Sequence, residues 1–304
     1  MKILVTGAAG FIGSYVVQAL LEQQISVIAV DNLSTGKLNN LSENVVFYEI
    51  DITQNDLEVV FQREKPDYVI HLAAQSSVIE SMKSPIEDCQ ANLFGTLNIL
   101  RYAKQYEVKK CMIASTAAVY GNPNELPVLE ESKLTSLSFY ALSKISAEKY
   151  AQLYERLFDV KSIILRFSNV FGPKQPKGVI TNLIQKLITG ETPVIYDGNQ
   201  TRDFIYVKDV ATACIQAILS ENTGVYNISS GVETSINKLY EEISELIGLK
   251  NEPIYESLRE GEIQQSVLSN EKAITTLKWN PSYSFVEGME ETIQYYYKLQ
   301  KQPF

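Results

Sequence analysis

The sequence contains only one histidine, three cysteines and one tryptophan among its 304 residues. With His71 alone, the chain cannot supply a metal site or a catalytic mechanism that requires two histidines. Cys89, Cys111 and Cys214 are odd in number and lack the spacing of metal ligands. We therefore expect no metal site, and we expect three free, buried thiols in a reducing compartment.

Long hydrophobic runs and blocks of basic residues are also missing. No apolar run reaches the length of a membrane span, and no lysine- or arginine-rich block offers a surface for a nucleic-acid backbone. The net charge of −9 favours solubility. The first apolar run starts beside Met1 and leaves no room for a signal peptide. We expect a cytoplasmic protein that binds neither membranes nor nucleic acids.

The composition that remains, 45% hydrophobic and 21% charged, is that of a globular protein. Strand-like apolar runs alternate with helical stretches through the first half of the chain. The apolar runs lie at 3–6, 26–30, 45–49, 68–72, 110–115 and 161–167. The helical stretches lie at 11–23, 86–106 and 139–158. This alternation predicts an α/β fold, a Rossmann-type doubly wound parallel sheet with right-handed crossovers.

A glycine-rich segment follows the first strand. Residues 6–13 read Thr-Gly-Ala-Ala-Gly-Phe-Ile-Gly, which places Gly7, Gly10 and Gly13 at the start of the first helix. Such glycines let a pyrophosphate approach the N–H groups at a helix N-terminus and let the helix pack close to the strand. By itself this triplet could also be a tight turn.

Asp31 ends the next strand, about 20 residues further on, where an acid accepts hydrogen bonds from the hydroxyls of an adenosine ribose. Strand, turn, helix, strand and acid in this order predict a dinucleotide site. No arginine follows Asp31 directly, so that a 2′-phosphate would meet a carboxylate. The pattern therefore favours NAD over NADP.

The second half has shorter elements and more glycine and proline. We expect helices at 179–189, 207–219, 235–247 and 284–299, in a smaller α+β part that forms the second wall of a cleft. The predicted division is 1–171 for the dinucleotide and 172–304 for the substrate, interleaved at the boundary. Ligands bind outside the carboxyl ends of the strands in such sheets. Those ends carry small or polar residues: Thr6, Asp31, Asp51, His71, Ser115 and Asn169.

Tyr140 and Lys144 lie four residues apart, on one face of a predicted helix. A tyrosine, with a free pKa of about 10, becomes a base at neutral pH only beside a positive charge. Lys144 and an oxidised nicotinamide could both supply that charge. The same spacing at Tyr106/Lys110 and Tyr297/Lys301 has no supporting context, and we interpret both pairs as solvated helix faces.

The strand before this helix ends in hydroxyls. Ser115 or Thr116 could hydrogen-bond a substrate oxygen beside Tyr140. The alternative for either side chain is a helix cap or a turn bond. The proximity of Tyr140 favours the functional interpretation.

Seven motifs together resemble the extended short-chain dehydrogenase/reductase family, in its sugar-nucleotide epimerase/dehydratase branch, and most resemble its UDP-glucose 4-epimerases. The resemblance covers nearly the whole chain. The motifs are Thr-Gly-Ala-Ala-Gly-Phe-Ile-Gly (6–13), His-Leu-Ala-Ala-Gln (71–75), Ser-Thr-Ala-Ala-Val-Tyr-Gly (115–121), Tyr-Ala-Leu-Ser-Lys (140–144), Leu-Arg-Phe-Ser-Asn-Val-Phe-Gly-Pro (165–173), Thr-Arg-Asp-Phe-Ile-Tyr-Val (201–207) and Arg-Glu-Gly-Glu (259–262).

This resemblance implies the roles of individual residues. The catalytic residues would be Tyr140 as base, Lys144 as its partner and Thr116 as the group that holds the 4-oxygen of the sugar. The residues that would contact NAD are Gly7, Gly10, Phe11, Ile12, Gly13, Asp31, Asn32, Asp51, Ile52, Leu72, Ala73, Ala74, Asn92, Tyr140 and Lys144. The residues that would contact a UDP-sugar are Ser77, Thr116, Asn169, Asn182, Tyr196, Arg202, Arg259, Glu262 and Ser266.

Some of these assignments have equally simple alternatives. Asp51 could instead cap the helix that follows it, and either arginine, Arg202 or Arg259, could form a surface ion pair. His71 is expected to end a strand rather than to do chemistry.

The sequence also departs from relatives in the resembled branch. Ala117 and Ala118 stand where dehydratases carry an Asp-Glu pair, which argues against removal of water. Ser168 replaces a common aromatic residue, and Ser266 stands at a position that varies with the substrate.

The resemblance therefore implies NAD-dependent 4-epimerisation of a UDP-hexose (UDP-glucose and UDP-galactose) through a transient 4-keto intermediate, and it leaves the N-acetyl forms of these sugars open as further substrates. Two alternatives stay open: a sugar-nucleotide 4-ketoreductase or dehydrogenase with an exchangeable cofactor, and a non-catalytic dinucleotide sensor. The family pattern also suggests a homodimer that forms through the helices near 86–106 and 139–158.

Overall fold

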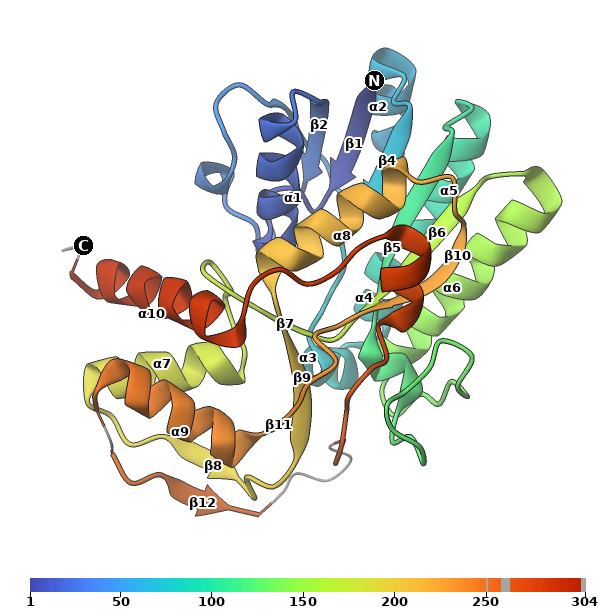
Figure 1. Cartoon of the computed structure of the whole chain (residues 1–304). Coiled ribbons are helices and arrows are strands. Elements are labelled where there is room, and N and C mark those ends of the chain that lie inside the picture. The colour runs from blue at the N-terminus through green and yellow to red at the C-terminus, as the bar shows by residue number, and fades with distance from the viewer. Residues whose placement is uncertain (250, 258–262, 302–304) are drawn as a thin grey trace.

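A seven-stranded sheet forms the larger part of the molecule (Figure 1). The computed structural model describes residues 1–249, 251–257 and 263–301. The sheet has the order β10-β6-β5-β4-β1-β2-β3, and all its neighbouring strands are parallel. Its strands are β1 (Lys2–Thr6), β2 (Ser26–Asp31), β3 (Val46–Glu49), β4 (Tyr68–His71), β5 (Lys110–Thr116), β6 (Ser162–Phe167) and β10 (Gly224–Ile228). The predicted α/β fold is confirmed.

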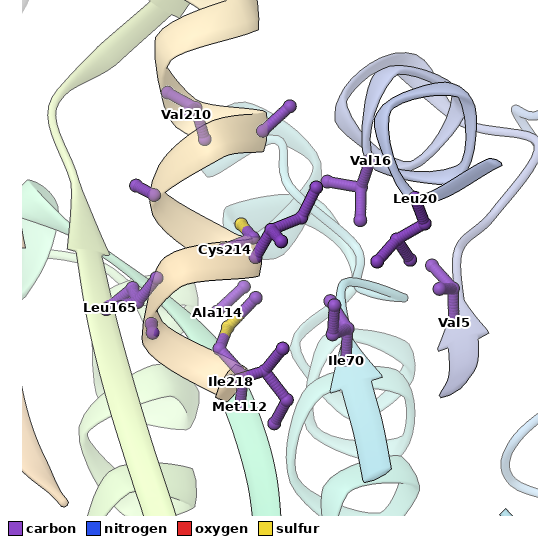
Figure 2. Close-up of a cluster of buried hydrophobic side chains, with 14 of the residues drawn as sticks. Val5, Val16, Leu20, Ile70, Met112, Ala114, Leu165, Val210, Cys214 and Ile218 are labelled. Carbon is purple, nitrogen blue, oxygen red and sulfur yellow. The ribbon is translucent and has the colours of Figure 1, made fainter. Parts of the chain in front are cut away.

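Helices cover both faces of this sheet. They are α1 (Phe11–Glu22), α2 (Leu57–Glu64), α5 (Gly95–Gln105), α6 (Phe139–Phe158) and α8 (Val207–Leu219), whereas α3 (Val78–Lys83) and α4 (Pro85–Cys89) pack against α6. Along β1, Ile3 and Val5 join one core cluster and Leu4 joins the other, because successive side chains of a strand point to opposite faces. Figure 2 shows the first cluster, in which Val210, Cys214 and Ile218 of α8 lie over the sheet.

The single helix expected at 86–106 is interrupted. A π-helical turn at Gln90–Phe94 separates α4 from α5, and Asn92 lies fully buried within it. Apolar periodicity does not distinguish such a turn from regular helix. Turns of this kind are frequent at functional sites.

The chain returns to the large sheet after the predicted boundary at residue 172. Both α8 and β10 come from the second half, and β10 pairs with β6 at the edge. Sequence analysis did not identify β10. The larger part is therefore built from segments on both sides of residue 172, and the predicted boundary between the two parts stays a prediction.

Among the described residues, the smaller part contains two short sheets and three helices, shown around α7, α9 and α10 in Figure 1. Its elements are β7 (Asn169–Phe171), α7 (Val179–Thr189), β8 (Val194–Tyr196), β9 (Thr201–Tyr206), β11 (Glu233–Ser235), α9 (Ile236–Ile247), β12 (Ile254–Glu256) and α10 (Phe285–Lys301). Phe171, Tyr206 and Phe285 pack ring against ring between β7, β9 and α10. The four helices expected in this half are all present.

Candidate active site

The glycine-rich turn brings α1 against the end of β1. Gly7 has a φ of +67°, which favours glycine. A Cβ on Gly13 would lie 2.0 Å from the Gly7 carbonyl oxygen. Gly10 is the N-cap of α1 and provides no side chain, so backbone N–H groups of the first turn have no side-chain cap. This is a cradle that suits the pyrophosphate of NAD.

Asp31 lies beside this turn. Its carboxylate is buried and accepts hydrogen bonds from the N–H of Ala9 at 3.0 Å and of Leu33 at 2.8 Å. The side chain that sequence analysis assigned to the ribose therefore contacts the glycine-rich turn itself. This arrangement fits a cofactor whose pyrophosphate and ribose are neighbours.

The residues assigned to the adenine end lie next to Asp31. Asn32 donates to Asp51 at 2.9 Å, and Asp51 also accepts from the N–H and the hydroxyl of Thr53. Burial alone would raise the pKa of Asp51, but these hydrogen bonds lower it below its usual value. Since α2 begins only at Leu57, Asp51 makes a local turn and does not cap that helix.

Other residues assigned to the cofactor are held by packing. Ile52 is buried against Gly95, where a Cβ would lie 2.4 Å from its side chain. A Cβ on Gly7 would lie 2.7 Å from the backbone nitrogen of Ala73 and 2.9 Å from the carbonyl carbon of Leu72. The segment after β4, in which Ala74 is exposed, therefore meets the glycine-rich turn.

His71 ends β4, as expected, and is fully buried. Its Nδ1 lies 2.7 Å from the Thr6 hydroxyl, and its Nε2 lies 3.0 Å from the Thr96 hydroxyl. Thr96 donates its own proton to the Asn92 carbonyl, so Nε2 carries the histidine proton and Nδ1 accepts from Thr6. Burial and the charge of Lys144 lower the pKa of His71 to about 3. The ring is a neutral structural link.

Tyr140, Lys144 and Thr116 are brought together at the carboxyl end of β5. Ser138 caps α6 by accepting from the N–H of Ala141, so the helix starts just before Tyr140. Thr116 is close enough to Tyr140 to lower the pKa of its hydroxyl, and the Thr116 oxygen accepts from the N–H of Ala118 at 3.2 Å. The cap that sequence analysis weighed as one alternative is therefore present, and the hydrogen bond from Thr116 to a substrate oxygen stays a prediction.

Desolvation is the main cause of the pKa shifts of Tyr140 and Lys144. Desolvation raises the pKa of Tyr140 to about 12, against the opposing effect of the Thr116 hydrogen bond. Desolvation lowers the pKa of Lys144 to about 8, while Glu148 and Asp88 act in the opposite direction. A tyrosine in this position becomes a base only when further positive charge is close. An oxidised nicotinamide carries such a charge.

A polar network connects α4, the π-helical turn and α6. The Asn92 amide donates to the Gln75 carbonyl at 3.0 Å, to Asp88 at 3.0 Å and to Ser143 at 3.2 Å. Ser77 lies next to this network and caps α3 by accepting from the N–H of Glu80. Asn92, assigned to the cofactor, is therefore held by protein groups beside Lys144.

Ser115 points into a different environment from Thr116. It is buried and donates to Glu148, which also accepts from Arg166 at 3.0 and 2.6 Å. Arg166 in turn donates to Tyr120 and to the Glu130 carbonyl. Of the two candidate hydroxyls, Thr116 alone contacts Tyr140. Sequence analysis missed Glu148 and Arg166, although Tyr140, Lys144 and Glu148 share a spacing of four.

The interpretation of Tyr106 and Lys110 as a solvated helix face is wrong. Lys110 begins β5 and is only 3% exposed. Its ammonium group donates to the carbonyls of Ala217 and Asn222 at the end of α8. The residue is therefore a structural cap.

Four of the residues assigned to the sugar nucleotide lie in the smaller part, whereas Thr116 ends β5 and Ser77 precedes α3. Asn169 is exposed on β7, which pairs with β9, the strand of Arg202. Arg202 donates to the Ile263 carbonyl at 2.8 Å and has further interactions. Asn182 is exposed on α7, and Tyr196 ends β8 in a separate two-stranded sheet. Arg259 and Glu262 lie outside the described residues.

Ser266 is buried, in a segment fixed to several elements. Val267 accepts from the N–H of Val128 at 2.9 Å, and the N–H of Leu268 donates to Asp203 at 3.3 Å. Ser168 also donates to Asp203, at 3.1 Å. Ser168 and the backbone of the segment that carries Ser266 therefore bind the same buried carboxylate.

The described part of the chain contains no group of three or more potential metal ligands among His, Cys, Asp and Glu. Within the same residues, no helix is long and apolar enough to span a bilayer. All three cysteines are free thiols. Cys111 and Cys214 are buried as expected, whereas Cys89 is only partly buried.

Comparison with known proteins agrees with this geometry. A profile of the NAD dependent epimerase/dehydratase family matches residues 3–229. The chain is 43% identical over 299 residues to a putative UDP-glucose 4-epimerase of Methanocaldococcus jannaschii, covering 96% of this chain and 97% of that protein.

Two solved structures superpose closely. The Thermotoga maritima UDP-glucose 4-epimerase with UDP-glucose has a TM-score of 0.97 at 38% identity and covers 99% of this chain and 100% of its own. The UDP-N-acetylglucosamine 4-epimerase of Methanobrevibacter ruminantium M1, in complex with UDP-N-acetylmuramic acid, has a TM-score of 0.93 at 35% identity and covers 98% of each chain.

The glycine-rich cradle beside Asp31, the Thr116–Tyr140–Lys144 group at the sheet edge and these similarities over nearly the whole length lead to one assignment: the chain belongs to the NAD dependent epimerase/dehydratase family.

Proposed function

We propose that the chain catalyses NAD-dependent 4-epimerisation of a UDP-hexose through a transient 4-keto sugar. The observation that carries this proposal is the placement of Thr116 at the carboxyl end of β5 beside Tyr140, whose pKa it lowers, with Lys144 one turn further along α6. Similarity to UDP-hexose 4-epimerases over nearly the full chain supports it.

Tyr140 is the proposed base. Its phenolate oxygen takes the proton of the sugar 4-hydroxyl and becomes the hydroxyl, while Thr116 fixes the 4-oxygen by a hydrogen bond. The Lys144 ammonium stabilises the tyrosinate and thereby offsets the desolvation that raises the pKa of Tyr140. Bound NAD supplies the reversible two-electron oxidation at C4. When the ketone is reduced on its other face, Tyr140 returns the proton.

The residues after Thr116 favour epimerisation over dehydration. Ala117 and Ala118 form the first turn of a 3-10 helix at Ala117–Tyr120. Neither side chain can donate or accept a proton, so this turn offers no acid–base pair to remove water.

The smaller part supplies the proposed UDP site. We assign the nucleotide to Asn169, Asn182, Tyr196 and Arg202, with Ser77 near the sugar. An arginine fork suits a diphosphate. Arg259 and Glu262 belong to the same proposal through their motif.

We also propose a homodimer that forms through α4, α5 and α6. Helices α4 and α5 both pack against α6, and exposed apolar side chains lie on α4, on the π-helical turn and on α6. The exposed side chains are Ile86, Phe94, Phe139, Leu142, Tyr150, Leu157 and Phe158. A patch of this kind on one face is typical of a protein interface. Free cysteines throughout are consistent with the proposed cytoplasmic location.

Tyr140→Phe should abolish most of the epimerase activity, because a general base contributes about 10² to 10⁴ in rate. The assay incubates the protein with UDP-glucose and resolves UDP-galactose, while nicotinamide absorbance reports net redox. Native protein should form the epimer with no net absorbance change. Tyr297→Phe, from the other described Tyr/Lys pair on a helix, is the control. If Tyr140→Phe keeps the native turnover, Tyr140 is not the base. If the native protein oxidises UDP-glucose stoichiometrically, the activity is that of a dehydrogenase and not of an epimerase.

Asp31→Ala should weaken NAD binding and relax discrimination against NADP. Hydrogen bonds to a charged group contribute about 1.5–3 kcal/mol, which corresponds to a roughly 10- to 150-fold increase in Kd. Asp31→Asn removes the negative charge but keeps an oxygen that can accept from the N–H of Ala9. This variant therefore shows how much of the effect comes from charge repulsion of the 2′-phosphate and how much from disruption of the glycine-rich turn. Titration of cofactor-free protein with NAD and NADP gives both constants. Tighter binding of NADP by the native protein would contradict this role for Asp31.

Ser266→Tyr should selectively remove turnover of UDP-N-acetylglucosamine. A small buried serine leaves space for an acetamido group, whereas overpacking costs about 1–3 kcal/mol, or roughly 5- to 150-fold in kcat/KM. The measurement is the ratio of kcat/KM for UDP-glucose and UDP-N-acetylglucosamine in both proteins. The proposal fails if the native enzyme does not use the N-acetyl sugar or if the ratio stays the same.

Leu142→Glu combined with Tyr150→Glu should convert the dimer into monomers, because two charges would be buried without partners. Sedimentation equilibrium at micromolar concentration measures the mass. Val59→Glu, at an exposed apolar position on α2, is the matched control and should remain dimeric. A native protein that sediments as a monomer would refute the interface.

A further inference from the structure

Asp88 is a buried carboxylate that the mechanism above does not use. It lies on α4 and is 1% exposed. One oxygen, Oδ1, accepts from Gln75 Nε2 at 2.9 Å and from Asn92 Nδ2 at 3.0 Å. Among the described residues no donor reaches the other oxygen, Oδ2. Burying a carboxylate oxygen without a hydrogen-bond partner is energetically unfavourable. A functional role for Asp88 would explain why it is kept at this position.

Hydrogen bonds connect Asp88 to the helix that carries Tyr140 and Lys144. The Asn92 amide that donates to Asp88 also donates to Ser143, the residue before Lys144. The π-helical turn at Gln90–Phe94 carries Asn92 between α4 and α6. Asp88 is thus linked to the turn of α6 that lies between Tyr140 and Lys144.

The charged and titratable groups around Lys144 come from four elements. Glu148 follows it on α6, the charge of Asp88 on α4 acts on it, and its own charge acts on His71 of β4. Glu148 is already paired with Arg166 of β6 at 2.6 Å. His71 is neutral, as its hydrogen bonds and lowered pKa indicate.

Asp88 differs from Glu148 in having no cationic partner. Within 1–249, 251–257 and 263–301, no lysine or arginine forms an ion pair with it. Asp88 is therefore the carboxylate near Lys144 whose charge is not already neutralised by an arginine.

We propose that Asp88 is a positioning residue of the reaction centre: its unpaired carboxylate balances the charge of Lys144, and its hydrogen bond to Asn92 holds α6 in register. This inference rests on the proposed function, because it assigns Tyr140 as base and Lys144 as its cation. It requires no group beyond those of the described chain.

The proposal fixes the sign of a pH effect. The negative charge of Asp88 raises the pKa of both Tyr140 and Lys144. The ionisations of these two groups bound the pH range in which the centre works, so a change in both pKa values moves both limbs of kcat/KM. Removing the charge lowers both pKa values. Both limbs should therefore move to lower pH.

Asp88→Asn tests this with a change of charge but almost none of shape. Its kcat/KM profile for the UDP-hexose should shift by about one pH unit towards acid in both limbs, as loss of one nearby charge requires. Glu87→Gln makes the same charge change at the adjacent, exposed position of α4 and should leave the profile in place. Asp88→Glu keeps the charge and should keep both limbs at the native pH even where kcat falls.

The outcomes separate the two proposals. If Asp88→Asn lowers kcat/KM equally at every pH, Asp88 has only a structural role and the inference is overturned. The same conclusion follows if the variant has a lower Tm while both limbs of its pH profile stay at the native pH. If native protein does not epimerise any UDP-hexose, the proposed function fails first. If Glu87→Gln shifts the limbs as far as Asp88→Asn, the effect is one of net charge and the inference is also overturned.

Discussion

The buried ion pair between Glu148 and Arg166 is the interaction on which the rest of the site depends. It brings α6 onto β6, and Ser115 attaches the same carboxylate to β5. Taking two charges out of water is unfavourable unless hydrogen bonds satisfy the remaining groups. Here Arg166 also donates to the Tyr120 hydroxyl, which donates to Asn227 of β10. One satisfied network therefore fixes α6 relative to three strands.

This network determines where the chemistry can occur. Lys144 and Tyr140 lie one and two turns before Glu148 on α6, so their positions follow from its anchor. On the other side of the centre, the close approach of Gly13 to Gly7 fixes α1 against β1. The two anchors stand at the carboxyl edge of the same parallel sheet, which is where α/β proteins bind their ligands.

The smaller part depends on a second buried carboxylate. Asp203 on β9 accepts from Ser168, from Ser230 and from the backbone of Leu268. It thereby joins the end of β6, the loop after β10 and the segment of Ser266. Burial raises the pKa of Asp203, although these hydrogen bonds oppose that effect. Residues far apart in sequence are thus held near the proposed sugar site by one side chain.

The sequence by itself determined the elements and most of the chemistry. Periodicity is local, so helices such as Phe139–Phe158 and Val207–Leu219 were found at their observed bounds. The glycine spacing and Asp31 likewise report a local backbone requirement.

Tertiary structure alone decided which polar groups meet. The partners of Asp88, Glu148 and Lys110 come from other elements, and neither the π-helical turn at Gln90–Phe94 nor the edge position of β10 has a local signal. For the same reason Ser115 and Thr116, adjacent in sequence, could not be told apart until the sheet placed one beside Glu148 and the other beside Tyr140. Successive side chains of a strand face opposite sides, and only the packing on each side gives them different partners.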